Sequence, residues 1–311
     1  MRVTANTFPN SLLDQLNSLS VRQNRLQTQA ATGQRIQLPE DDPVAMRRVL
    51  DMQAEAKTLG QYERNIARHQ ELAQTTYASL RSLKTISDRA SEIATAADGL
   101  DSRDDLLLLA KEVTELIKQA VQITNTQNRS DYIFGGTRTD VPPFVLATAS
   151  DGTVTGVTYQ GNLNQAESEI AESITLNTQV IGENTSGTGP RGLITDNRVG
   201  ADFFNHLIAL QDNLINGNVT AIENTDRAAL SQDEDNFLYH IGSNGAIQSR
   251  LEATASLTSD RGFSLETLIS KEADADLAQT LVRLTQTQTA YQAALQSGGR
   301  ILGSSLLDYL R

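Results

Sequence analysis

Apolar side chains recur at alternating intervals of four and three residues near the end of the chain. The positions of this repeat are Leu277, Leu281, Leu284, Gln288, Tyr291, Leu295, Gly298, Leu302, Ser305 and Tyr309. This spacing places one narrow apolar stripe along one side of a helix, which is typical of a coiled coil or a helical bundle. We therefore expect one long terminal helix within residues 265–311, and it requires a partner helix.

The beginning of the chain has the same repeat and predicts that partner. Its positions are Leu12, Leu16, Leu19, Gln23, Leu26 and Ala30. Gly33 follows the helix of about 11–32 and is suited to the left-handed conformation that ends a helix. The two ends of the chain are thus expected to pack together, with both termini at one place.

A corner is expected between the first helix and the second. Pro39 breaks the helix, and Asp42 followed by Pro43 supplies an N-cap and a first-turn proline for the next one. The adjacent carboxylates of Asp41 and Asp42 could bind a metal or carry out acid–base chemistry. They lie on a loop with no third ligand nearby in sequence, which favours a helix–helix corner.

The middle of the chain changes from helical to β-type periodicity and back. A long helix is expected over 44–97, and a third helix follows the capping residue Ser102. From Tyr132 to about Ile194, short β-type runs at 143–146, 154–159 and 173–180 are separated by glycine-rich turns. Helices are expected again over 201–215 and from 226 onward, with a joint at Gly262.

These elements predict a mainly α protein with a small β insert. The expected architecture is an elongated helical-hairpin, coiled-coil rod with both termini at one end and the insert at the other. Residues 1–43 and 265–311 would form a terminal coiled-coil domain, 44–130 and 201–264 a helical rod domain, and 131–200 an outer β-rich domain.

Composition and charge narrow the class of protein. The net charge is −12, and 131–239 contains fifteen acids, four Arg and no Lys, whereas both ends are nearly neutral. Such a chain is a poor partner for nucleic acid, which binds basic surfaces. There is no Cys, which excludes disulfides and thiolate chemistry. Neither a signal peptide nor a membrane span is expected, so leaving the cell would require a route other than the ordinary secretory one.

Motifs for catalysis are weak. Residues 187–192 match the G-x-G-x-x-G pattern, but Pro190 interrupts it and polar loop follows instead of the helix that a dinucleotide site requires. His69, His206 and His240 have no partner at metal-ligand or catalytic spacing. We therefore expect no catalytic residue, cofactor or metal, and an enzyme using the glycine loop is kept as an alternative.

Three stretches carry a resemblance to a known family. The corner Thr32-Gly-Gln-Arg-Ile, followed by Pro39-Glu-Asp-Asp-Pro-Val-Ala, resembles the bacterial flagellin superfamily. The C-terminal half is similar through Glu272-Ala-Asp-Ala-Asp, Tyr291-Gln-Ala-Ala-Leu and Leu306-Leu-Asp-Tyr-Leu. The insert is similar to that of the family's hook–filament junction members through Tyr132-Ile-Phe-Gly-Gly-Thr-Arg-Thr, Pro143-Phe and Tyr159-Gln-Gly. Flagellins usually continue their Asp-Asp pair with Ala-Ala-Gly, whereas this chain has Pro-Val-Ala.

The resemblance implies a structural subunit rather than an enzyme. It implies export through the flagellar type III channel with a cytoplasmic chaperone, and assembly into a ring between the first hook-associated protein and the flagellin filament. Flagellin itself and a cytosolic coiled-coil signalling adaptor are the alternatives. We expect subunit contacts at Leu12, Leu16, Leu19, Gly33, Arg35, Asp41, Asp42, Leu281, Leu284, Leu295, Leu302 and Leu306.

Overall fold

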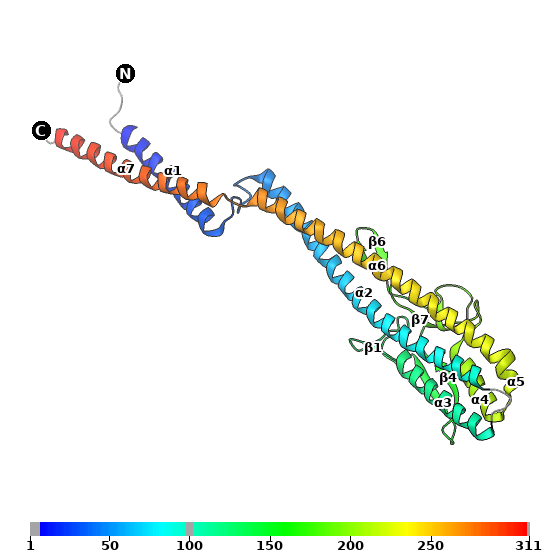
Figure 1. Cartoon of the computed structure of the whole chain (residues 1–311). Helices are drawn as coiled ribbons and strands as arrows, with labels where there is room; N and C mark the ends of the chain where they lie inside the picture. Colours follow the sequence, from blue (N-terminus) through cyan, green and yellow to red (C-terminus); the bar gives the residue numbers. More distant parts are fainter. Residues whose placement is uncertain (1–6, 98–101, 310–311) are drawn as a thin grey trace. The chain divides into compact units, whose positions relative to one another are not determined.

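A computed structural model describes the backbone of residues 7–97 and 102–309, and the side chains of 10–97 and 102–300. The chain divides into two compact units. The first unit comprises residues 1–58 and 260–311, and the second comprises 59–259. Helix α2 (Pro43–Ala96) and helix α6 (Arg227–Ala273) each contribute residues to both units (Figure 1).

The first unit is built around a pair of terminal helices. Helix α1 (Thr7–Thr32) packs against helix α7 (Leu277–Tyr309). The two run antiparallel, because Leu12 contacts Gly298 at one end of the pair and Gly33 bonds to Ala275 at the other. The unit also contains the beginning of α2 and the end of α6.

The second unit holds the remaining helices and all the strands that the structure describes. The helices are α3 (Arg103–Thr124), α4 (Phe203–Asn216), the short α5 (Val219–Ala221) and a π-helical turn, η1 (Ile222–Asp226), that leads into α6. The strands are β1 (Gln127–Asn128), β2 (Asp131–Tyr132), β3 (Phe144–Thr148), β4 (Val154–Tyr159), β5 (Ser168–Ala171), β6 (Ile174–Leu176), β7 (Ile181–Asn184), β8 (Gly192–Asp196) and β9 (Ala201–Asp202).

The strands form small separate sheets. Three antiparallel pairs join β1 to β2, β3 to β4 and β5 to β6. The fourth sheet has the order β7-β8-β9, in which β7 and β8 are parallel and β8 and β9 are antiparallel. Sheets this small need helices to cover their apolar side chains.

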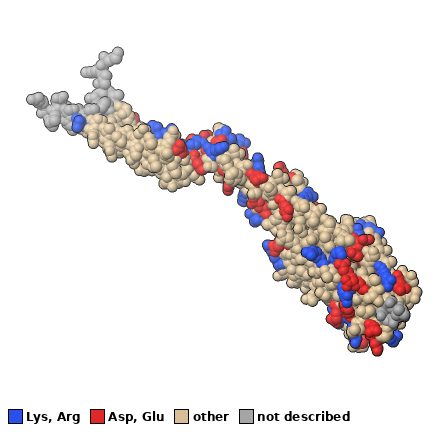
Figure 2. Space-filling view, viewed as in Figure 1, with Lys and Arg blue, Asp and Glu red and all other residues tan. Residues whose placement is uncertain are grey.

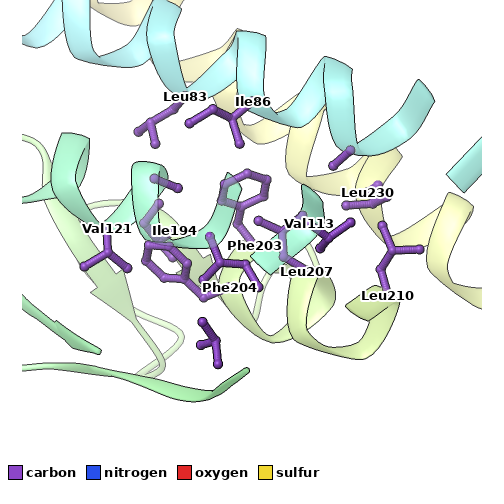
Figure 3. Packing of buried hydrophobic residues seen from close by; sticks show 14 of the residues in the cluster. Leu83, Ile86, Val113, Val121, Ile194, Phe203, Phe204, Leu207, Leu210 and Leu230 are labelled. Carbon is purple, nitrogen blue, oxygen red and sulfur yellow. The ribbon is translucent and has the colours of Figure 1, made fainter. Parts of the chain in front are cut away.

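The main core of the second unit lies where α2, α3, α4 and α6 meet β8 (Figure 3). Phe203 and Leu207 of α4 are fully buried, as are Val113 of α3 and Leu230 of α6. Phe203 also meets Phe237 edge to face, with ring centroids 4.9 Å apart. This contiguous core gives the second unit a stable interior of its own.

The expected fold class is confirmed in its main point, since the protein is mainly helical with a small β insert. The first two helices end within a residue or so of the expected positions. Ser102 caps α3, accepting a hydrogen bond from the Asp105 backbone N–H at 3.2 Å. The threefold domain division stays a prediction alongside the two compact units.

Two expectations about the elements are wrong in detail. The run expected over 173–180 is a strand only at β6, and strands β1, β2, β5 and β7 to β9 lie outside the expected runs. The joint expected at Gly262 is absent, because α6 continues through that residue to Ala273. The break lies at residues 274–276, where the Ala275 backbone N–H bonds to Gly33 instead of continuing the helix.

Candidate assembly surface

Helices α1 and α7 are held together by a narrow and partly polar interface, which we call the seam. On α1 the less exposed positions follow the expected repeat, and Leu26 is the one among the described side chains of this helix that is buried. On α7 they are Thr280, Leu284, Thr287, Gln288, Tyr291, Ala294 and Gly298. Several of these are small, and a Cβ at Gly298 would overlap the end of the Leu12 side chain. Small side chains let the two helices approach closely but bury little apolar surface.

Four large apolar side chains of α7 remain about half uncovered. Leu277, Leu281, Val282 and Leu295 are 49%, 52%, 55% and 48% exposed. We call these four residues the open stripe. Leu281 and Leu295, which belong to the expected repeat, are thus about half exposed, whereas Thr280, Thr287 and Ala294 are less exposed.

Charge is sparse along these two helices. Figure 2 shows the visible face of α1 and α7 as mostly uncharged, with charged side chains gathered where α1 ends and α2 begins. Within the described side chains, α7 carries only Arg283 and Arg300. An exposed apolar stripe on a nearly uncharged helix is typical of a protein–protein contact.

The corner after α1 is tied to the α6–α7 break by a short backbone pairing. Gly33 has a φ of 75° and ends α1. The Arg35 backbone N–H donates to the Ala273 carbonyl at 2.6 Å, and the Ala275 N–H donates to the Gly33 carbonyl at 2.7 Å. The Arg35 side chain donates to the Glu272 carbonyl at 2.6 Å. The corner after α1 and the break between α6 and α7 are thus fixed to each other.

The two corner carboxylates stabilise the loop. Asp41 accepts the backbone N–H groups of Gln37 and Leu38, each at 3.1 Å, and pairs with Arg25 at 2.7 Å. Asp42 caps α2 by accepting the Ala45 N–H at 3.0 Å. These backbone hydrogen bonds hold the pKa of both carboxyls below its usual value, with smaller contributions from nearby arginines. The corner interpretation therefore fits the geometry.

The residues expected at subunit contacts fall into three places. Gly33, Arg35, Asp41 and Asp42 come together at the corner, with Glu272 and Arg48 as unexpected partners, their side chains 3.1 Å apart. The α1–α7 seam holds Leu12, Leu16, Leu19 and Leu284. Leu281 and Leu295 belong to the open stripe, and the side chains of Leu302 and Leu306 lie outside the described residues.

Polar groups elsewhere take part in structural contacts. The glycine loop 187–192 connects β7 to β8, and no helix follows it directly. The buried side chain of Asn184 closes this loop by donating to the Thr188 and Pro190 carbonyls, both at 2.6 Å. Among the described residues, no group of His, Asp and Glu has the arrangement of a metal site. Within the same residues, none of the helices combines the length and apolar character needed to cross a membrane.

Comparison with known proteins identifies the first part of the chain. Residues 3–139 match the sequence model of the bacterial flagellin N-terminal helical region. The chain carries a flagellin-type N-terminal region. This region includes α1, the corner and α2, so the resemblance expected from the corner motif is confirmed.

The similarity to flagellar proteins extends along nearly the whole chain. It is 26% identical over 307 residues to flagellar hook-associated protein 3 of Salmonella typhimurium, covering 92% of both chains. It is 27% identical over 301 residues to the protein of that name from Escherichia coli, covering 90% of both. These relatives are hook-associated proteins, which favours the junction interpretation over flagellin.

Solved structures of flagellar proteins share the fold. A protein from Vibrio parahaemolyticus described as a flagellar hook-associated protein superimposes with a TM-score of 0.62 at 18% identity, covering 75% of this chain and 100% of that one. FlgL of Bacillus cereus gives 0.55 at 18% identity, covering 71% and 99%. The chain is thus similar in sequence to flagellar hook-associated protein 3 and shares the fold of these solved flagellar proteins.

Proposed function

We propose that this chain is a structural subunit of the bacterial flagellum that joins the hook-associated end to the flagellin filament. The observation that carries the proposal is the similarity to hook-associated protein 3 over about nine tenths of both chains. It covers the β insert as well as the flagellin-type region. The partners would be the first hook-associated protein on one side and flagellin on the other.

The first unit supplies a physical reason for assembly. Among its described residues, more large apolar side chains are exposed than buried, and the exposed ones include the four residues of the open stripe. Fully burying a leucine stabilises a contact by roughly 1.5–3 kcal/mol, so covering this stripe is worth several kcal/mol per subunit. Identical neighbouring copies would supply the cover, which leads to a ring of subunits.

The contact residues divide by role in this proposal. Leu281 and Leu295 would meet neighbouring copies directly, together with Leu302 and Leu306 further along α7. Leu12, Leu16, Leu19 and Leu284 would hold the α1–α7 pair in register. Gly33, Arg35, Asp41 and Asp42 would fix the direction in which that pair leaves the corner.

A weakly stabilised first unit also suits export. A subunit that crosses a narrow type III channel must be extended. Because the α1–α7 seam buries little apolar surface, separating the two helices costs little free energy. A cytoplasmic chaperone would cover the apolar helices until export. The protein would then be located outside the cell, in the flagellum.

The test is assembly of a variant of the open stripe. Leu281→Asp combined with Leu295→Asp places two charges on half-exposed positions of α7 where a neighbour would pack. We expect at least a tenfold loss of subunit at the hook–filament boundary, detected with labelled antibody in the source bacterium. Leu108→Asp is the matched control, because Leu108 is 68% exposed on α3 in the second unit.

Two outcomes would contradict the proposal. Normal attachment of the doubly substituted subunit would remove the open stripe as a contact. Growth of long fibres from purified subunit added to filament seeds would indicate flagellin instead, since a junction subunit should not elongate a filament.

A further inference from the structure

Two hydrogen-bonded pairs of polar side chains cross an otherwise apolar helix interface in the second unit. His206 and Asn213 lie seven residues apart on α4, so they occupy the same side of that helix. Asp226 and Asp233 have the same separation across η1 and the start of α6. His206 Nδ1 lies 2.7 Å from Asp233 Oδ2, and Asn213 Nδ2 donates to Asp226 Oδ2 at 2.8 Å.

The carboxylates of both pairs are buried. The Asp233 side chain is 0% exposed, and Asp226 as a residue is 3% exposed. Leu207 and Leu210 of α4 and Leu230 of α6 belong to the buried apolar core of the same elements. A buried carboxylate is costly unless a cation or hydrogen bonds compensate it.

His206 is the cation available to these acids. Within the part of the chain that the structure describes, no Lys or Arg forms an ion pair with Asp226 or Asp233. Arg227 instead donates to the Ala94 carbonyl of α2 at 2.9 Å. The charged groups that face His206 are all acidic: Asp233 from α6, Asp226 from η1 and Asp202 from β9.

We propose that His206 and Asp233 form a pH-sensitive clasp that holds α4 against α6 while His206 is protonated and weakens when it loses its proton. The clasp includes the backbone, because the Asp202 N–H donates to Asp233 Oδ1 at 2.9 Å. Loss of the imidazolium charge leaves a buried carboxylate with that hydrogen bond and a neutral imidazole. The proposal does not depend on the function proposed above.

The direction of the pH effect follows from the pKa shifts. Burial opposes the charge on His206, but the hydrogen bond to Asp233 and the nearby acids outweigh it and raise the pKa above 6.5. Burial also raises the pKa of Asp233. Each group therefore binds its proton more tightly in the folded state. Their contribution to stability is fully present at low pH and is lost as the pH rises through the folded pKa of His206.

The other two histidines behave differently and serve as internal references. His69 is enclosed by the hydroxyls of Thr178 and Ser168, and burial lowers its pKa. Burial lowers the pKa of His240 to about 4. Proton NMR of the full chain has only three imidazoles to resolve. We expect His206 to titrate above pH 6.5 and the others below it, and a His206 pKa at or below 6.5 would overturn the proposal.

The variant test is Asp233→Asn. An asparagine keeps both hydrogen bonds, accepting from the Asp202 N–H and donating to a neutral His206, and it requires no counter-ion. We expect the urea midpoint of the wild-type chain, followed by circular dichroism, to fall between pH 6.5 and 9. Each unit of pKa shift corresponds to about a tenfold change in the folding equilibrium. The midpoint of Asp233→Asn should stay nearly constant over the same range.

Asp196→Asn is the matched control. Asp196 is also 0% exposed, but it pairs with Arg198, which does not titrate in this range. This variant should lose stability at every pH while its decline between pH 6.5 and 9 parallels that of the wild type. A decline in Asp233→Asn equal to that of the wild type would overturn the clasp.

Discussion

At the scale of single residues, the motif that begins at Tyr132 marks a tightly closed turn in the β insert. Gly136 has a φ of 66°, and a Cβ there would overlap the carbonyl oxygen of Asn162. The Tyr159 hydroxyl donates to the Phe134 carbonyl at 3.0 Å and joins the same turn to β4. Gly161 lies directly against that hydroxyl. The glycines of the motif therefore serve close packing.

This packing predicts the effect of a methyl group. Gly136→Ala should destabilise the second unit by about 2 kcal/mol or more, because it combines a left-handed backbone with a clash against a carbonyl. Gly156→Ala in β4 is the control, since a Cβ there meets nothing within 4 Å and should change stability by less than about 1 kcal/mol. Equal urea midpoints for the two variants would contradict the account.

At the scale of elements, the corner and the α6–α7 break form one structure. The corner residues follow α1, and Ala273 and Ala275 lie some 240 residues later in the sequence, yet their backbones pair. Arg35 reinforces this pairing through the Glu272 carbonyl and lies 3.7 Å from Asp42. The direction in which α7 leaves α6 thus depends on residues near the beginning of the chain.

Arg35→Ala should loosen the corner without unfolding either helix. Removing a half-exposed, charged hydrogen bond costs about 1 kcal/mol, so the backbone amides at position 35 and at Ala275 should exchange hydrogen about fivefold faster. The control is Arg47→Ala, an exposed arginine of α2 for which no ion pair is seen. Unchanged exchange at Ala275 in Arg35→Ala would show that the backbone pairing alone holds the corner.

At the scale of the whole molecule, the two units differ in how much apolar surface they bury. The second unit has a contiguous core of leucine, isoleucine and phenylalanine side chains. The described part of the first unit buries few apolar residues, among them Leu26, Ile36, Val49 and Leu265. Local stability follows burial, so opening should be much easier in the first unit.

Hydrogen exchange of the isolated subunit tests this difference. In dilute solution we expect the amides of 10–32 and 277–300 to exchange at least about a hundredfold faster than those of α3 and α4. Protection of the terminal helices should rise in the assembled flagellum, because neighbours cover the open stripe. Terminal helices that are as well protected in the solitary subunit as α3 would contradict assembly-coupled ordering.

The sequence alone determined those features of the protein that depend on residues close together along the chain. Helix periodicity placed α1 and α2, Gly33 and Asp42 specified the ends of helices, and the change of period at Tyr132 located the β insert. The motifs at the corner and the insert also pointed to the flagellin superfamily. Each of these depends on residues within a few turns of one another, where spacing fixes geometry.

Tertiary structure decided what depends on contacts between distant residues. Thr280, Thr287 and Ala294 are less exposed than Leu281 and Leu295, because small side chains let α1 and α7 approach closely. The break at residues 274–276 exists because Ala275 pairs with Gly33. His206 acquired its carboxylate partner only when α4 packed on α6, because residue spacing along one element carries no record of which other element will lie across from it.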